Sequence, residues 1–326
     1  AFFFVLILAI LLLTGLIKAF ATFFPSLNFL LNEPAGSRDP SSRELISSVV
    51  SNLRNLAAAV IASAVCARVL ERRSVGSVGF KLHRGWSRDF WLGSLMGLGS
   101  LAIAVGIAVA AGAVSFEVQT RSGAQIMRGF IIVFLFFLIA GATEELIFRG
   151  FPFQALVHNL GGAAAVVITS VLFGLAHLSN NDASAFSTIN TMLAGVWLGL
   201  TYLMTRSLWL ATALHYSWNF AMAFIFGLPV SGFPMFTSLA WLRGIIGAPF
   251  WISGGSYGPE GGAAVTLALI LSTLAIWKCG LFTPSEEMLS ALKHRKPEPA
   301  FVSITPEEQP PSDPHPSEEE SNPSPS

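Results

Sequence analysis

The chain has 326 residues, of which 53% are hydrophobic and 12% are charged, and its mean hydropathy is +0.63. Because an average soluble domain carries about 25% charged residues, this composition argues against a soluble single domain. The 19 basic and 19 acidic residues balance, so no charge excess indicates a nucleic-acid partner. We therefore expect the lipid bilayer, rather than a nucleic acid, to be the partner of this chain.

Apolar segments long enough to cross about 30 Å of hydrocarbon predict an all-α, polytopic membrane bundle of about eight transmembrane helices. The predicted spans cover residues 2–24, 45–70, 89–114, 126–149, 163–179, 186–205, 208–227 and 262–282. The first span is longer than the apolar core of a signal peptide, and no basic segment precedes it. Because the sequence begins at Ala1 rather than at Met, we expect the natural N-terminus to lie upstream.

Basic residues in the loops predict the orientation of the bundle. The loop 71–88 contains Arg72, Arg73, Lys81, Arg84 and Arg88. Alternation of sides along the chain places Arg149, Arg206 and Lys278 on the same face as this loop. The positive-inside bias makes that face cytoplasmic, so we expect the C-terminal tail to be cytoplasmic as well.

Changes in composition divide the chain into three regions. Residues 1–114 are expected to form N-terminal transmembrane helices, and residues 115–283 a core that includes the last helix. Residues 284–326 are rich in Pro, Ser and acidic residues. Because this last segment has too little apolar content to offset the entropy of ordering, we predict a disordered acidic tail.

Ionisable side chains within the predicted spans mark a candidate site. Glu144, Glu145 and Arg149 lie in the fourth span, His177 at the end of the fifth and His215 in the seventh. Each such group costs about 2.5–3.5 kcal/mol at the centre of a membrane helix, so we expect them to face the interior of the bundle. Glu145 and Arg149 are four residues apart and can neutralise each other. Glu144 lies about 100° around the helix and is left without a local cation.

A short Gly-rich turn predicts that the fourth and fifth spans bring two of these groups together. A connection at residues 160–162 would fold the two spans into an antiparallel hairpin. Glu144 and His177 are equidistant from this turn in the sequence, so they should lie at a similar depth. Pro152 predicts a kink between them and the turn.

The seventh span adds His215 and Asn219, which are four residues apart and therefore point the same way at a comparable depth. A carboxylate and an imidazole in a cavity of low dielectric are suited to deprotonating water, and a second imidazole with a carboxamide can stabilise a tetrahedral oxyanion. Glu144, His177 and His215 also form a three-ligand set suitable for zinc, with a position open for water. The same residues fit a buried structural ion network or polar helix packing as well.

Three motifs, EELIFRG (144–150), FGLAH (173–177) and HYSWN (215–219), resemble the ordered EExxxR, FxxxH and HxxxN motifs of the CPBP/Abi family. That family comprises CAAX proteases and bacteriocin-processing proteins and includes the type II CAAX prenyl proteases. The resemblance covers residues 126–227 and implies that Glu144 and His177 activate water while His215 and Asn219 hold the oxyanion. Supporting roles are implied for the remaining motif residues, Glu145, Arg149 and Phe173.

The resemblance implies an intramembrane endopeptidase of glutamic or zinc type that acts on a membrane-associated peptide or protein, of CAAX type or carrying a leader peptide. No cofactor is required on the preferred interpretation, and zinc bound by Glu144, His177 and His215 is the alternative. Because many members are bacterial, we expect a bacterial plasma membrane. Two other functions stay open, a non-catalytic membrane scaffold and a proton-coupled transporter that uses the same Glu and His residues as a relay. The internal repeats of many transporters are not evident in the sequence.

Overall fold

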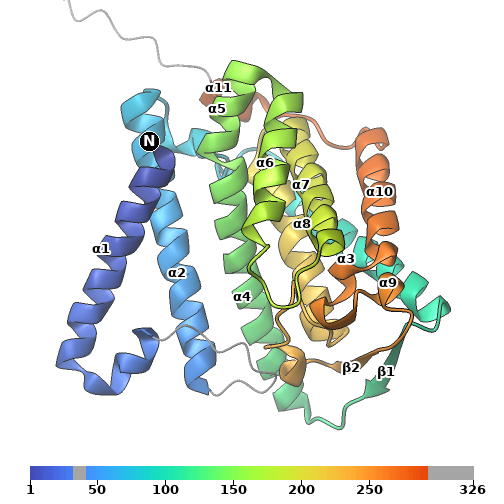
Figure 1. Ribbon diagram of the computed structural model, residues 1–326. Coiled ribbons are helices and arrows are strands. Elements are labelled where there is room, and N and C mark those ends of the chain that lie inside the picture. Colours follow the sequence, from blue (N-terminus) through green and yellow to red (C-terminus); the bar gives the residue numbers. More distant parts are fainter. Residues whose placement is uncertain (32–41, 293–326) are drawn as a thin grey trace, which may run out of the picture. The chain divides into compact units, whose positions relative to one another are not determined.

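The computed structural model describes residues 1–31 and 42–292, and these residues fold mainly into helices (Figure 1). The long helices are α1 (Phe2–Phe23), α2 (Ser42–Val65), α3 (Trp86–Ala110), α4 (Gly123–Arg149) and α7 (Ala185–Thr205). Shorter helices are α5 (Phe151–Leu160), α6 (Gly162–Ala176), α8 (Leu208–Phe220), α9 (Phe250–Ser253), α10 (Ala263–Lys278) and α11 (Glu286–Leu292). Helix α2 continues as a π-helical turn over Cys66–Leu70, and α8 continues as another over Ala221–Ile225.

Helices occupy all eight predicted windows, and the helical class of the fold is confirmed. Within the described residues, four helical segments are long and apolar enough to cross a membrane: Phe2–Phe23, Arg43–Leu70, Trp86–Ala110 and Gly123–Leu160. Helices α6 and α10 are apolar but shorter. The structure therefore supports an integral membrane protein with a helical bundle, whereas the count of eight spans is not confirmed.

Helix α8 lies at the centre of the bundle, where it packs against α3, α4 and α7 (Figure 1). All of its residues except Trp209 are buried, including the polar residues Thr212, His215, Ser217 and Asn219. Two glycines of α3, Gly93 and Gly97, allow a close approach. A Cβ atom at Gly97 would overlap the hydroxyl of Ser217 and the carbonyl of Leu214. Small residues spaced in this way are a common means of packing helices in membranes.

The predicted hairpin between the fourth and fifth spans is present, with a break in its first arm. Helix α4 ends at Arg149, and Pro152 lies in the first turn of α5, where a missing N–H costs nothing. Gly161 then reverses the chain into α6 with a φ of +87°, a conformation that favours glycine. The kink predicted from Pro152 is therefore a short separate helix, and the turn predicted at residues 160–162 is confirmed.

A small antiparallel sheet was not predicted, because almost all of its residues lie between the predicted spans, within residues 115–125 and 228–261. Strand β1 (Val114–Val118) pairs with β2 (Leu242–Ile246), and Val114 lies opposite Ile246. Each strand has only five residues, so the period-two pattern is too short to stand out beside long apolar helices. The sheet ties the segment between α3 and α4 to the long connection between α8 and α10.

The C-terminal segment begins with ordered structure where a disordered tail was predicted to start at residue 284. Helix α11 covers Glu286–Leu292, and the side chain of Met288 is fully buried. Glu287 accepts a hydrogen bond of 2.6 Å from the backbone N–H of Arg84 and one of 3.4 Å from Lys81. This contact places α11 and the basic loop 71–88 at the same end of the bundle. The rest of the predicted tail, residues 293–326, lies outside the described residues.

Candidate active site

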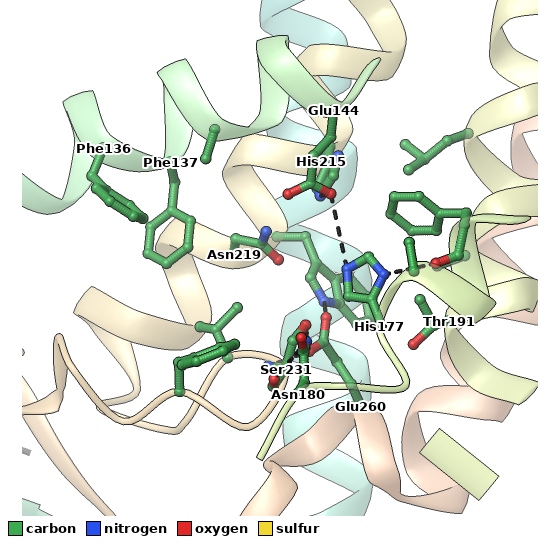
Figure 2. A pocket seen from close by; sticks show the side chains of 18 of the residues that line it. Phe136, Phe137, Glu144, His177, Asn180, Thr191, His215, Asn219, Ser231 and Glu260 are labelled. Carbon is green, nitrogen blue, oxygen red and sulfur yellow. Dashed lines mark hydrogen bonds and ion pairs between the residues drawn. The ribbon is translucent and has the colours of Figure 1, made fainter. Parts of the chain in front are cut away.

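A cavity of about 510 Å³ opens among α2, α4, α7, α8 and α10 and the connection between α8 and α10. The four residues predicted to be catalytic, Glu144, His177, His215 and Asn219, all line this cavity. Figure 2 shows Glu144, His177 and His215 converging, with Asn219 beside them. The structure therefore brings together side chains from α4, α8 and the end of α6 that are up to 75 positions apart in the sequence.

Glu144 occupies the middle of this group and has no hydrogen-bond partner among the described residues. Its Oε2 atom lies 3.9 Å from Nε2 of His177 and 3.8 Å from Nε2 of His215. Both separations are longer than a direct hydrogen bond, and a gap of this size is one that a water molecule can bridge. About a third of the side chain (34%) is exposed and lines the cavity, whereas the Oε2 atom itself is buried.

His177 directly follows α6, and a backbone carbonyl fixes its ring. Its Nδ1 atom lies 2.7 Å from the carbonyl oxygen of Phe173, one helical turn earlier. A carbonyl only accepts hydrogen bonds, so Nδ1 carries the proton in this contact. The neutral ring consequently presents the lone pair of Nε2 toward Glu144. The FxxxH spacing thus selects the tautomer that can accept a proton in the cavity.

His215 is held by the second glutamate of the EE pair. Its Nδ1 atom donates to Oε1 of Glu145 at 2.9 Å, and Arg149 contacts the same oxygen at 3.1 Å. Arg149 also donates to the carbonyl oxygen of Gly195 at 3.1 Å. The side chains of Glu145 and Arg149 have no exposed surface. The predicted pairing of these two residues is therefore confirmed as a contact, and Glu145 points away from the cavity toward His215.

Phe173 packs beneath the two imidazoles. Its ring centre lies 4.7 Å from that of His177 and 5.9 Å from that of His215, and the guanidinium carbon of Arg149 lies 4.5 Å from the ring centre. The side chain is buried. A cation over an aromatic face is attracted by the ring, so this contact also stabilises the buried Arg149. Phe173 accordingly restricts the movement of both histidine rings.

Asn219 lies one helical turn after His215 on α8. It lines the cavity, and its carboxamide has no hydrogen-bond partner among the described residues. A carboxamide left in this state can donate to an oxygen atom that enters the cavity. The i, i+4 spacing of the HYSWN motif therefore directs a second polar group at the same space as His215.

The zinc alternative was tested against the positions of its three expected ligands, Glu144, His177 and His215. The residue types suit zinc, whose ligand atoms lie about 3.4 Å apart in a tetrahedral site. The separations from Oε2 of Glu144 to the two imidazoles, 3.9 and 3.8 Å, are longer than this. Throughout residues 1–31 and 42–292, no three His, Cys, Asp or Glu side chains are arranged to hold a metal ion. In the present arrangement the three residues do not fit a zinc site.

Glu260 also lines the cavity, although no sequence pattern singled it out. Its carboxylate accepts hydrogen bonds from the Trp218 indole at 3.3 Å and from the backbone N–H and hydroxyl of Ser231, both at 2.7 Å. Figure 2 places Glu260 and Ser231 at the side of the cavity opposite Glu144. An acidic residue in a long Gly/Pro-rich segment carries no periodic signal, so it could not be assigned to the cavity from the sequence.

Helix α2 contributes a polar wall that was also missed. Ser48, Ser51, Asn52 and Asn55 line the cavity, together with Arg54. Their spacing of three and four residues puts the serines and asparagines on one helix face. An arginine within a predicted span was the signal that could have indicated this wall, because such residues are rare in membrane helices.

Comparison with known proteins agrees with the motif resemblance. Residues 126–221 match the family model described as type II CAAX prenyl endopeptidase Rce1-like. No curated protein and no solved structure matches the chain. The matched segment contains all seven predicted site residues and excludes α1, α2, α3 and α10. The match therefore supports a CAAX protease-like domain over residues 126–221 of the chain.

Proposed function

We propose that this protein is an intramembrane endopeptidase that hydrolyses a peptide bond of a membrane-associated substrate with water activated by Glu144 and His177. The observation that carries the proposal is the approach of one unpartnered carboxylate to two imidazoles, at 3.9 and 3.8 Å, inside a cavity of a membrane bundle. The family match supports protease activity and agrees with this interpretation.

Glu144 and His177 are suited to hold and deprotonate a water molecule. A water between Oε2 of Glu144 and Nε2 of His177 would donate a hydrogen bond to each, and one of them would accept its proton. The water oxygen then forms a bond with the substrate carbonyl carbon, and the electron pair of the C=O bond moves to the carbonyl oxygen. When that pair returns, the C–N bond breaks and the proton passes to the leaving amine. The products are a carboxylate and an amine.

His215 and Asn219 are suited to stabilise the oxyanion formed in this step. Because Nδ1 of His215 already donates to Glu145, its Nε2 can donate only when the ring is an imidazolium. The adjacent carboxylates of Glu144 and Glu145 compensate such a charge. Asn219 supplies an N–H that no other described group uses. Donors placed in advance around the developing negative charge are typically the largest contribution to catalysis of this kind.

Glu145 and Arg149 act on His215 and not on the substrate. They are fully buried, and the chain of contacts from Gly195 through Arg149 and Glu145 to His215 fixes the imidazole. The ring of Phe173 packs against the imidazole of His215. In this proposal the three supporting residues are positioning residues.

The substrate we propose is a membrane-anchored peptide or protein that enters from the bilayer, with the CAAX and leader-peptide classes both open. We further propose that the bundle crosses the membrane eight times in a bacterial plasma membrane, with α11 and the loop 71–88 on the cytoplasmic side. The contact of Glu287 with Arg84 supports a common side for these two segments. The basic residues of the loop favour the cytoplasm for that side.

The proposal is tested with the purified full chain in lipid nanodiscs. Wild type is incubated with a prenylated CAAX reporter and with a panel of membrane-anchored peptides, and the products are identified by mass spectrometry. We expect cleavage by wild type and none above background with Glu144→Ala or His177→Ala. Cleavage that both variants retain would refute the site, and retained folding with no cleavage of any substrate would favour a scaffold or a transporter.

A second arm of the same experiment addresses the metal. With Glu144 and His177 acting on water directly, cleavage should be insensitive to a chelator, and the active protein should contain less than one metal ion per chain by elemental analysis. Loss of cleavage with the chelator and its recovery on addition of zinc would establish the zinc-type mechanism in place of the one proposed.

A further inference from the structure

The wall of the cavity formed by α2 differs chemically from the rest of that helix. Ser48, Ser51, Asn52 and Asn55 face the cavity, whereas Leu53 and Val60 are exposed on the outside of the helix. Helix α2 belongs to the segment Arg43–Leu70, which is long and apolar enough to cross a membrane. Polar side chains in such a segment raise the free energy of insertion into the bilayer unless they line a water-filled cavity or contact a ligand.

Arg54 is the charged member of this wall. Its Nε and Nη2 atoms donate to Oδ1 of Asn55 at 3.2 and 3.1 Å, and Nη1 lies 3.4 Å from the hydroxyl of Thr14 on α1. No described Asp or Glu forms an ion pair with Arg54. A guanidinium has five N–H donors, so donors and the full positive charge are left over after these neutral contacts. Arg54 therefore lacks the anionic partner that a buried or membrane-embedded cation normally has.

The other charges of the cavity do not supply that partner. Arg54 is the one Arg or Lys among the described residues that line it, and the carboxylates are Glu144 and Glu260. Neither forms an ion pair with Arg54 within 4 Å in the described chain. Glu260 is already bound by Trp218 and Ser231. The cavity thus has a carboxylate and imidazole side and a separate cationic side on α2.

We propose that Arg54, together with Asn52 and Asn55, forms a subsite for the C-terminal carboxylate of the peptide substrate. This inference rests on the proposed function, because the subsite shares its cavity with Glu144. A substrate with a C-terminal CAAX sequence ends in a free carboxylate within three residues of its cysteine, so the carboxylate enters the cavity with the scissile bond. Arg binds carboxylates through two parallel hydrogen bonds, and this geometry gives orientation as well as affinity.

The position of Arg54 along α2 favours a peptide carboxylate over a lipid phosphate. Arg54 lies at least about 16 Å from either end of the segment Arg43–Leu70, measured along a helix with a rise of 1.5 Å per residue. Lipid phosphates lie at the membrane surface, beyond the hydrocarbon. A carboxylate delivered through the cavity reaches Arg54 without drawing a headgroup into the hydrocarbon.

The test compares two substrates that differ only at the C-terminus, a prenylated CAAX peptide acid and its C-terminal amide. We expect wild type in uncharged nanodiscs to cleave the acid about 10- to 100-fold more efficiently than the amide, mainly through a lower KM. This range is the one expected for a hydrogen-bonded charge. Arg54→Gln should remove the preference for the acid, because the KM for the acid rises more than the KM for the amide, and Arg54→Lys should keep part of the preference.

Arg68→Gln is the matched control, because Arg68 lies on the same helical segment, is exposed and does not line the cavity. It should leave the preference intact. Equal losses for acid and amide in Arg54→Gln, or no loss for either, would overturn the proposal. A preference that appears only in nanodiscs with anionic lipid would also overturn it and would assign Arg54 to a lipid phosphate.

Binding separates this inference from the proposed function. Trp197 and Trp218 line the cavity, so their fluorescence can report the binding of a tripeptide acid that corresponds to the three C-terminal residues of the substrate. We expect saturable binding of the acid to wild type, and binding at least about 10-fold weaker for the tripeptide amide and for Arg54→Gln. Binding of the acid without any cleavage would refute the peptidase and keep the subsite. Cleavage of the acid and the amide with equal efficiency would support the peptidase and refute the subsite.

Discussion

The segment that matches the protease family and helix α2 face the same cavity with different kinds of polar side chain. Residues 126–221 supply Glu144 and two imidazoles whose orientations are fixed by the carbonyl of Phe173 and by Glu145. Helix α2, outside the match, supplies amides, hydroxyls and Arg54. On the proposed function, the family segment contains the groups that break the bond, whereas α2 presents the groups that recognise the substrate.

A second comparison lies within the motif EE itself. Glu145 has no exposed side-chain surface and contacts Arg149 and His215, whereas Glu144 is 34% exposed and has no hydrogen-bond partner among the described residues. A carboxylate without a hydrogen-bond partner in a polar cavity lowers the stability of the fold and can accept a proton from water. Glu145 is held through its Oε1 atom by Arg149 and His215, while its Oε2 atom has no hydrogen-bond partner, and a buried group held in this way positions its neighbours. Adjacent residues of one type thus have opposite expected roles.

Exchanging each carboxylate for its amide gives the largest expected effect and tests this comparison directly. Glu144→Gln should lower kcat by about 10²- to 10⁴-fold, because a general base is lost, and should leave thermal stability unchanged or higher. Glu145→Gln should lower stability by about 3–5 kcal/mol, because Arg149 stays buried without its counter-charge. Initial rates and thermal unfolding in the same nanodiscs measure both quantities.

Equal effects of Glu144→Gln and Glu145→Gln on stability and activity would contradict the different roles expected for the two glutamates. A stability loss in Glu144→Gln as large as that in Glu145→Gln would mean that Glu144 is a member of the structural ion network. Full activity in Glu144→Gln would remove it from the reaction altogether. Glu145→Gln is expected to keep part of its activity at low temperature, because an amide oxygen can still accept from Nδ1 of His215.

Local spacing and one turn were enough to predict which residues of the core meet. The i, i+4 separations predicted the pairing of Glu145 with Arg149, and the position of Gly161 midway between Glu144 and His177 predicted their common depth. These inferences need only helix geometry and a tight turn. The helical windows of the bundle were predicted separately, from the length of the apolar segments.

Glu260, the sheet and α11 depend on contacts between segments far apart in the sequence, and such contacts produce no periodic pattern of residues. Glu260 reaches the cavity through the long connection after α8, and its partners Trp218 and Ser231 are 42 and 29 residues away. The five-residue strands form only as a pair separated by more than 120 residues. Helix α11 is stabilised by burial of Met288 and by contact with the loop 71–88, so the acidic composition of its surroundings gave no sign of it.

Substitution of Asn219 and of Asn190 gives the next largest expected difference between two variants. The carboxamide of Asn219 has no hydrogen-bond partner among the described residues, whereas that of Asn190 has three. Asn190 donates to the carbonyls of Glu260 and Gly262 and accepts from Thr266. Asn219→Ala should lower kcat by about 10²- to 10³-fold with KM and stability nearly unchanged, as for loss of an oxyanion donor. Asn190→Ala should lower stability instead, by about 1–3 kcal/mol for the groups left unpaired. An unchanged kcat in Asn219→Ala would contradict its assignment to the oxyanion.

Glu260→Gln gives the smallest expected effect and tests whether the connection between α8 and α10 only closes the cavity. The amide keeps one acceptor, and its NH₂ group meets either the N–H of Ser231 or the indole N–H of Trp218, each of which needs an acceptor. We expect a loss of about 1–2 kcal/mol in stability and a change in kcat/KM of no more than about threefold for acid and amide substrates alike. The measurements are thermal unfolding and the two-substrate assay. A selective loss for one substrate would show that Glu260 recognises the substrate. Recognition by this cavity would then extend beyond α2 to the connection that covers it.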